Sequence, residues 1–285
     1  MHGPCHITRI GRQSGRRYGR DDPHGSIRRK HQKVKFHWTP LQQTEGAADN
    51  SAQEEQKRRA AAAAALVVEP SMVVGLGVGS TVGYVLPALA KRMRGGELKN
   101  VVYVASSAEV AARAAFLGLP VVVLNERPHI DLSIDGADEV DRELRLLKGR
   151  SGSPVCEKTL AQASRRRVIV VDHSKLSDWL GQRARLAVEV FPFAWRLEHA
   201  YLQELGASPE LRIADGGHFL TECGNLVLDC DFRRFGRPTD PAELSASLDA
   251  RAGIAGHGLF VNLVTEVFVG KDSGVHLIVA QRGDG

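Results

Sequence analysis

The chain has 285 residues, enough for two domains, and its 43% hydrophobic and 25% charged residues are typical of a soluble globular protein. No apolar run approaches the roughly 18 residues that a membrane-spanning helix needs, so we expect no membrane partner. The four cysteines are scattered and lack a Cys-x-x-Cys spacing. This pattern argues against a disulfide framework or a metal site and favours a reducing cytoplasm.

The N-terminal segment carries the net charge of +5. Residues 1–60 hold 13 Lys and Arg against 6 Asp and Glu, whereas the remaining residues hold 25 against 27. Residues 1–50 lack a helical or strand period and are rich in Gly, Arg, His and Gln, which predicts a disordered basic tail. Few aromatic residues argue against a nucleic-acid-binding arm, and the acids Asp21 and Asp22 together with few Ser argue against an organellar transit peptide. We therefore favour a dispensable tail, with the other two readings left open.

Ordered structure is expected from residue 51, because Ser51 and Glu54 have the spacing of a helix N-terminal capping pair and Pro70 stops the Ala-rich run. Strands and helices then alternate. Strands are predicted at 71–76, 100–106, 119–125, 130–135, 144–148 and 166–172, and helices to about residue 94, at 107–118 and from Pro154. This order predicts a Rossmann-like α/β domain over residues 51–184, with a mostly parallel sheet and helices on both faces.

The pattern changes near Arg185. Strands are predicted at 185–193, 211–214, 218–222, 225–232 and 257–263, with helices at 194–206 and 240–250. Asp240 and Pro241 occupy the cap and first positions of the second helix. This βαββαβ-like order predicts a smaller α+β domain of ferredoxin-like type over residues 185–264. Two further strands in residues 265–285 are expected to complete the first sheet.

A glycine-rich turn, Gly75 to Gly83, joins a strand to a helix. Glycines let backbone amides approach an anion, and a helix N-terminus carries partial positive charge. The next strand ends in Ser106 and Ser107, with no acid for a ribose diol, which argues against a dinucleotide. Ser80 and Thr81 at the helix start favour a phosphate, although Ser80 could simply cap the helix.

Acidic residues follow the strand at 130–135. Asp135 and Asp138 are close enough to present two carboxylates to one cavity at the carboxyl end of the sheet, where ligands bind. Such a pair suits proton transfer to and from hydroxyls, although an Asp-Gly hairpin turn with solvated charges explains the pattern equally well. For Glu139 and Asp141 we favour the solvated turn.

Three more side chains follow strand ends. Lys148 precedes a Gly- and Ser-containing loop, where a buried ammonium and loop amides could stabilise an oxyanion. Glu157 lies one turn into the next helix and could act as a general base. Lys175 follows the strand at 166–172 and is a natural partner for phosphate. Together the loops predict one site for a small phosphorylated substrate that undergoes proton transfer.

From about residue 54 to the C-terminus these residues resemble the type A ribose-5-phosphate isomerase family. The family's Gly-x-Gly-Thr-Gly-Ser-Thr loop is similar to residues 75–81, its Asp-Gly-Ala-Asp-Glu signature to residues 135–139, and its Lys-Gly-Gly-Gly-Gly run ending in Glu-Lys to residues 148–158. The segments DHSKL, VEVFPFAW, GNLVLD and GHGLF also resemble the family.

The resemblance implies an aldose–ketose isomerase that interconverts D-ribose 5-phosphate and D-ribulose 5-phosphate through an enediol(ate), in the non-oxidative pentose phosphate pathway. It implies that Glu157 shuttles a proton between C1 and C2 and that Lys148 steadies the oxyanion. Asp135 and Asp138 would handle hydroxyl protons and ring opening. The residues that it places at the substrate are Val78, Gly79, Ser80, Thr81, Gly136, Ala137, Gly149, Arg150, Ser151 and Lys175. It also implies no metal or organic cofactor and a homodimer or homotetramer.

Several residues depart from the family pattern. Val78 replaces a Thr, Arg150 and Ser151 replace glycines, Pro154 stands for a Leu, and TECGN replaces T-D-N-G-N. We expect them to affect efficiency rather than identity, because the groups that do the chemistry are present. The alternative is a non-catalytic sugar-phosphate sensor whose basic tail serves DNA. A sensor has no use for Glu157 nine residues after Lys148, so the sequence favours the enzyme.

Overall fold

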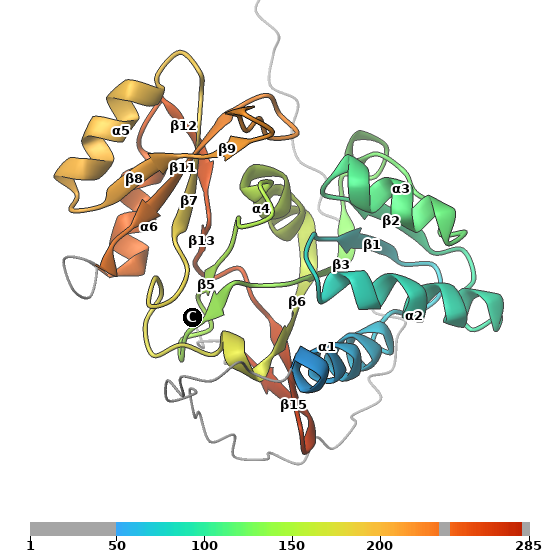
Figure 1. Ribbon diagram of the computed structural model, residues 1–285. Coiled ribbons are helices and arrows are strands. Elements are labelled where there is room, and N and C mark those ends of the chain that lie inside the picture. The colour runs from blue at the N-terminus through green and yellow to red at the C-terminus, as the bar shows by residue number, and fades with distance from the viewer. Residues whose placement is uncertain (1–49, 234–239, 281–285) are drawn as a thin grey trace, which may run out of the picture. The chain divides into compact units, whose positions relative to one another are not determined.

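The computed structural model describes residues 50–233 and 240–280, and its larger sheet has six strands (Figure 1). These are β1 (Val73–Leu76), β2 (Val102–Ala105), β3 (Ile130–Asp135), β6 (Ser164–Asp172), β14 (Glu266–Lys271) and β15 (Gly274–Val279). They lie in the order β15-β14-β6-β3-β1-β2. All neighbours pair in parallel except β15, which is antiparallel to β14 at the edge. The expected mostly parallel sheet, completed by the C-terminal strands, is confirmed.

Helices cover both faces of this sheet. They are α1 (Asn50–Ala65), α2 (Val82–Arg94), α3 (Ala108–Phe116) and α4 (Pro154–Ala163). The alanines of α1 and the apolar side chains of α2 pack over Leu76, Leu132 and Ile134 in one buried cluster. The close approach of α1 requires Gly270 in β14, because a Cβ there would lie 2.0 Å from the Gln56 carbonyl oxygen. On the other face, Leu160 of α4 packs against Val104 and Ile130.

The strand predicted at 119–125 is wrong. Two backbone hydrogen bonds join this segment to β2: Tyr103 N–H donates to Pro120 O, and Val122 N–H donates to Tyr103 O, both at 2.8 Å. The chain then forms a 3₁₀ turn at Leu124–Glu126. Pro120 has no N–H to extend the ladder, so the pairing is limited to a single bridge at the sheet edge.

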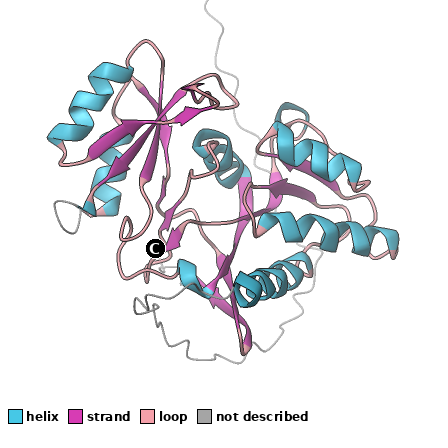
Figure 2. Ribbon diagram, in the orientation of Figure 1, coloured by secondary structure: helices cyan, strands magenta, loops and turns pink. Residues whose placement is uncertain are grey.

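The smaller sheet contains β7 (Leu186–Val190), β8 (Ser208–Leu211), β11 (Leu226–Asp231) and β12 (Ile254–His257). Its antiparallel order β12-β7-β11-β8, with α5 (Trp195–Glu204) and α6 (Pro241–Asp249), is the predicted split-βαβ arrangement (Figure 2). Asp240 caps α6 by accepting from Ala242 N–H at 2.7 Å. The strand predicted at 218–222 is reduced to β10 (Gly217–His218), which pairs with β9 (Ile213–Ala214).

Short strands and α4 lie between the two larger sheets. β4 (Glu139–Val140), β5 (Leu146–Leu147) and β13 (Leu259–Phe260) form a third, antiparallel sheet. α4 contacts β1, β3 and β6 on one side and β7 and β12 on the other (Figure 1). Groups carried by α4 and β5 can therefore meet groups from the ends of the parallel strands.

Several sequence-based expectations concern the chain ends. The tail predicted for residues 1–50 lies outside the described residues, apart from Asn50, where α1 begins. Ser51 therefore lies inside α1 instead of capping it, and α1 ends at Ala65, before Pro70. Within residues 50–233 and 240–280, no helix is long and apolar enough to cross a membrane. The domain boundary near residue 185 stays a prediction.

Candidate active site

The acidic and glycine-rich loops meet where β1 and β3 lie side by side. The chain leaves β1 for β2 on one side, whereas β3 pairs with β1 on the other, so this is a switch point of the sheet, and ligands bind at the carboxyl ends of such strands. Gly77 N–H donates to Ile134 O at 2.9 Å. A Cβ on Gly77 would lie 1.9 Å from Asp135 Oδ1, so only glycine leaves room for this carboxylate.

A buried ammonium joins two carboxylates at this point. Lys148 Nζ lies 3.0 Å from Asp135 Oδ1 and 3.2 Å from Glu157 Oε1, and it donates to Gly136 O at 2.6 Å. The Glu157 side chain is 1% exposed. Within the described residues, neither of its carboxylate oxygens accepts a hydrogen bond of good geometry, so the ion pair with Lys148 is its polar contact. This carboxylate is thus poorly solvated and free to accept a proton.

Local structure explains how the three groups meet. Lys148 follows β5, and its N–H donates to Gly258 O at 2.8 Å. Gly258 approaches so closely that a Cβ there would lie 1.9 Å from the Lys148 carbonyl oxygen. The Lys148 ammonium also stands 5.6 Å from the centre of the Phe260 ring. Glu157 lies in the first turn of α4, which Pro154 begins at a position where a missing N–H costs nothing.

Burial dominates the electrostatics of the site. Desolvation raises the pKa of Glu157 to about 8, against the opposing effect of the Lys148 charge. Desolvation also raises the pKa of Asp135, again opposed by Lys148. For Lys148, burial acts to lower the pKa, but the carboxylates of Asp135 and Glu157 outweigh it and raise the pKa. The site therefore holds one cation, a Glu157 carboxyl group that can exchange a proton near neutral pH, and an Asp135 carboxyl group whose pKa is also raised.

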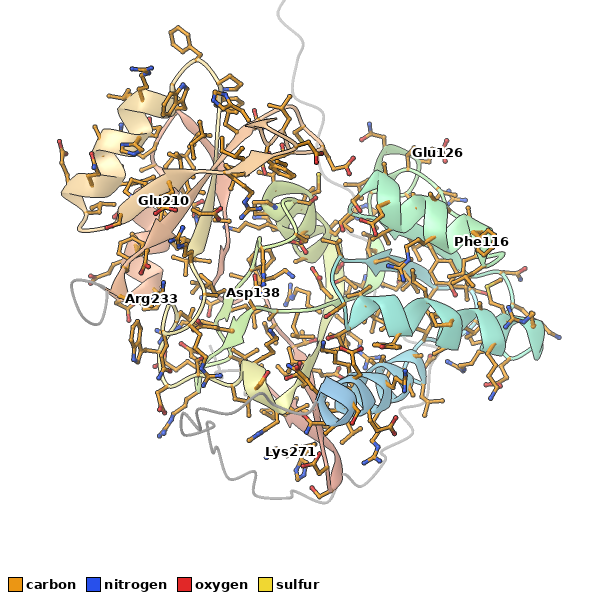
Figure 3. All side chains as sticks on the ribbon, in the orientation of Figure 1. Phe116, Glu126, Asp138, Glu210, Arg233 and Lys271 are labelled. Carbon is orange, nitrogen blue, oxygen red and sulfur yellow. The ribbon has the colours of Figure 1, made fainter. Side chains whose placement is uncertain are left out.

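Asp138, labelled in Figure 3, is half-buried and is hydrogen-bonded to the loop after Lys148. Its N–H donates to Leu147 O at 2.8 Å, and its Oδ2 accepts from Arg150 N–H at 3.1 Å. The structure thus places Asp135 in the cluster with Lys148 and Glu157. Asp138 lies next to this cluster, where it is hydrogen-bonded to the backbone N–H of Arg150.

The expected solvated turn at Glu139 and Asp141 is wrong. Glu139 is 0% exposed, and its carboxylate accepts from the N–H groups of Gly181, Arg183 and Ala184 at 2.6 to 3.0 Å. Asp141 is also buried and pairs with Arg145 at 2.6 Å. Both carboxylates therefore hold the chain around the site together, because a buried charge is retained only with such partners.

The glycine-rich loop that the sequence predicts to bind phosphate lies at the start of α2. Gly79 has a φ of +136°, which favours glycine, and Ser80 is exposed. Thr81 occupies the cap position and its side chain makes no capping hydrogen bond, so Ser80 is not the cap of α2. The Val78 side chain packs against the main apolar cluster instead of offering the hydroxyl of a Thr.

The loop after Lys148 accommodates its departures from the family pattern. Gly149 and Gly152 have φ values of +103° and +89°, whereas Arg150 and Ser151 do not have positive φ. Glycine is therefore kept where the backbone requires it, and the two substituted positions are exposed and unstrained. Gly136 and Ala137 are half-buried in the turn that leads from Asp135 to Asp138.

Lys175 ends a 3₁₀ turn, His173–Lys175, directly after β6. It is half-buried at the same edge of the sheet, but among the described residues no hydrogen bond or ion pair joins it to the carboxylate cluster. The sequence predicts no role for Gly258, Phe260 or Arg212, although the GHGLF segment resembles the family. Arg212 donates to Gly149 O at 3.1 Å from 63 residues away, a contact that no local pattern signals.

Comparisons with known proteins place the chain in a family. The model of the ribose 5-phosphate isomerase A (phosphoriboisomerase A) family matches residues 102–274. Ribose-5-phosphate isomerase A of Chloroflexus aurantiacus is 46% identical over 76% of this chain and 90% of its own. The structure of ribose 5-phosphate isomerase from Plasmodium falciparum has a TM-score of 0.77 and 31% identity, covering 80% of this chain and 100% of that one.

A D-ribose-5-phosphate isomerase solved in complex with phospho-erythronic acid has a TM-score of 0.76 and 33% identity, covering 79% of this chain and 98% of that one. Sequence and fold thus agree over most of the described residues. The glycine loop, the acidic turn and the Lys148–Glu157 run, which resemble the family, supply the residues of the candidate site. The chain belongs to the ribose 5-phosphate isomerase A family.

Proposed function

We propose that Asp135, Lys148 and Glu157 form the active site of an aldose–ketose isomerase that interconverts D-ribose 5-phosphate and D-ribulose 5-phosphate. The observation that carries the proposal is the Glu157 carboxylate, which is buried, lacks hydrogen bonds from the described residues and lies 3.2 Å from Lys148 Nζ. Desolvation raises its pKa to about 8, near the working pH of a general base. Membership of the family supports the same reaction.

Isomerisation moves a proton between neighbouring carbons. Glu157 takes the proton from C2 of the open-chain aldose, leaving an enediolate, and returns it to C1 to give the ketose. Negative charge develops on the substrate oxygen in this step, and the buried Lys148 ammonium stabilises it. Asp135, held by Lys148 at 3.0 Å, and Asp138 move protons between the hydroxyls and assist ring opening.

The phosphate is held away from the reacting carbons. Gly79, Ser80 and Thr81 lie at the N-terminus of α2, where amides and partial positive charge favour an anion. Lys175 supplies a cation at the same edge of the sheet. A related isomerase binds phospho-erythronic acid, a phosphorylated carboxylic acid. The same compound should therefore compete with substrate here, with its phosphate in the glycine loop and its carboxylate near Lys148.

A sugar-phosphate sensor is the weaker alternative. It would need the phosphate loop but would gain nothing from burying the Glu157 carboxylate, which costs stability.

We further propose that the reaction needs no metal or organic cofactor, so turnover should survive EDTA. Self-association into a homodimer or homotetramer stays a prediction that light scattering of the purified protein tests.

The decisive experiment replaces Glu157 by Gln, which keeps the side-chain shape and removes the base. We expect kcat for ribose 5-phosphate to fall at least about 10²-fold, the scale of lost general-base catalysis, with substrate still bound. Deuterium incorporation at C2 in D₂O should be lost with it. Glu126→Gln, an exposed substitution elsewhere, is the matched control (Figure 3). Near wild-type turnover of Glu157→Gln would show that another group is the base.

A further inference from the structure

The loop from Gly149 to Ser153, which follows Lys148, is held from the smaller sheet. Arg212 follows β8, and its guanidinium donates from Nη1 to Gly149 O at 3.1 Å and to Arg150 O at 3.3 Å. The Phe219 ring packs against Gly152 so closely that a Cβ on Gly152 would lie 2.3 Å from the ring. One side of the loop is therefore fixed by residues more than 60 positions along the chain.

Arg212 is itself rigidly placed. Its Nε and Nη2 donate to the two carboxylate oxygens of Asp229 on β11, at 2.8 and 2.5 Å. Its guanidinium carbon stands 5.5 Å from the centre of the Phe219 ring. The side chain is only 16% exposed. A bidentate arginine–carboxylate pair of this kind fixes the plane of the guanidinium, so the third nitrogen can act as a directed donor.

The geometry of the peptide group transmits this orientation to the site. In a trans peptide the carbonyl of one residue and the N–H of the next point in opposite directions. The Gly149 carbonyl accepts from Arg212 and, within the loop, from Gly152 N–H at 3.0 Å. The Arg150 N–H therefore points the other way, and it donates to Asp138 Oδ2 at 3.1 Å. One peptide group thus connects Arg212 to an acid of the proposed active site.

The next peptide is oriented in the same way. The Arg150 carbonyl also faces Arg212, so the Ser151 N–H points away from it. Within the described residues this N–H has no acceptor. It is a donor left free in the loop directly after Lys148, which is where an oxyanion of the substrate requires one.

We propose that Arg212 is a positioning residue. It orients the Gly149–Arg150 peptide so that the Arg150 N–H donates to Asp138, and the Arg150–Ser151 peptide so that the Ser151 N–H can donate to the substrate oxyanion. The inference rests on the proposed function of Lys148 and Glu157. Arg212 does not touch the reacting atoms. It acts through the backbone, and Asp229 acts through Arg212.

The proposal makes a specific kinetic prediction. Donors that act on developing charge lower the barrier without strengthening ground-state binding, so their loss reduces kcat and leaves KM nearly unchanged. Arg212→Gln should lower kcat about tenfold or more while KM for ribose 5-phosphate stays within about twofold. Asp229→Asn leaves Arg212 present but no longer fixes the plane of its guanidinium. This variant should therefore also lower kcat, by a smaller factor than Arg212→Gln.

The experiment compares both variants with wild type and with Arg185→Gln, which removes an exposed arginine that pairs with Glu210 in the same sheet. Melting temperatures within a few degrees of wild type show that the fold is kept. If Arg212→Gln does not fold, Asp229→Asn decides the question. An unchanged kcat, or a raised KM at constant kcat, overturns the role of Arg212. An inactive wild-type protein would refute the proposed function instead.

Discussion

Glu157 should make the protein less stable than it could be. Burial raises its pKa from the ordinary 4.5 to about 8, so the folded chain retains a proton that the unfolded chain releases between these values. A raised pKa contributes stability that is fully present below pH 4.5 and is lost as the pH rises towards 8. Replacing Glu157 by Gln, which stays neutral, should therefore stabilise the fold at neutral and alkaline pH.

The magnitude follows from the two pKa values. Each pH unit between 4.5 and about 8 changes the free energy of unfolding by ~1.4 kcal/mol, which gives about 5 kcal/mol in all. Relative to wild type, Glu157→Gln should thus be more stable by about 1 kcal/mol at pH 5 and by about 4 to 5 kcal/mol at pH 9. Such a gap is large beside the whole stability of a domain and is the kind of cost that active sites carry.

Urea unfolding at pH 5, 7 and 9 measures this gap, with Glu126→Gln as the exposed control that should show no pH-dependent difference. The essential result is the trend with pH, because a simple packing change would shift the free energy of unfolding equally at every pH. If the gap between Glu157→Gln and wild type is constant, or if it closes as the pH rises, then the carboxylate is not held in a desolvated state and the reasoning is wrong.

Three further predictions concern activity. Because Glu157 must lose its proton to act as a base, kcat/KM should rise about tenfold per pH unit up to a plateau near pH 8, and a flat profile from pH 6 to 9 would contradict this. Gly77→Ala would place a Cβ 1.9 Å from Asp135 Oδ1 and displace this carboxylate, so kcat/KM should fall at least about 10²-fold. Steady-state kinetics of this variant, with its melting temperature as the check on folding, tests the prediction. Replacing Ser80 and Thr81 together by Ala should raise KM more than it lowers kcat, and unchanged KM would remove this loop from the phosphate site.

The sequence by itself determined most of the architecture. Apolar periodicity placed β1, β2, β3, β6 and the β14–β15 pair, and local cap chemistry placed the start of α6 at Asp240. These signals are readable because they depend on neighbouring residues only. Parallel strands point one way, so the sequence predicts Asp135 and the glycine-rich loop at one edge of the sheet. It predicts Lys148 there too, but Lys148 follows β5 of the separate antiparallel sheet.

The tertiary structure decided which charges serve the site and which serve the fold. Glu139 and Asp141 share the acidic turn with Asp135, yet Glu139 is fully buried because amides about 40 residues later in the chain, at Gly181 to Ala184, accommodate its charge. A local pattern cannot show whether such partners exist. It likewise cannot show that Pro120 limits the edge segment after α3 to one bridge.

The pKa of Glu157 and the orientation of the loop after Lys148 have the same origin. The first depends on how completely α4 is packed between two sheets, and the second on Arg212 and Phe219 from the smaller sheet. Burial and hydrogen-bond direction are properties of the assembled fold, since they arise from atoms that lie far apart in the chain. The sequence therefore determined which candidate catalytic groups were present, and only tertiary packing decided their charge state and orientation.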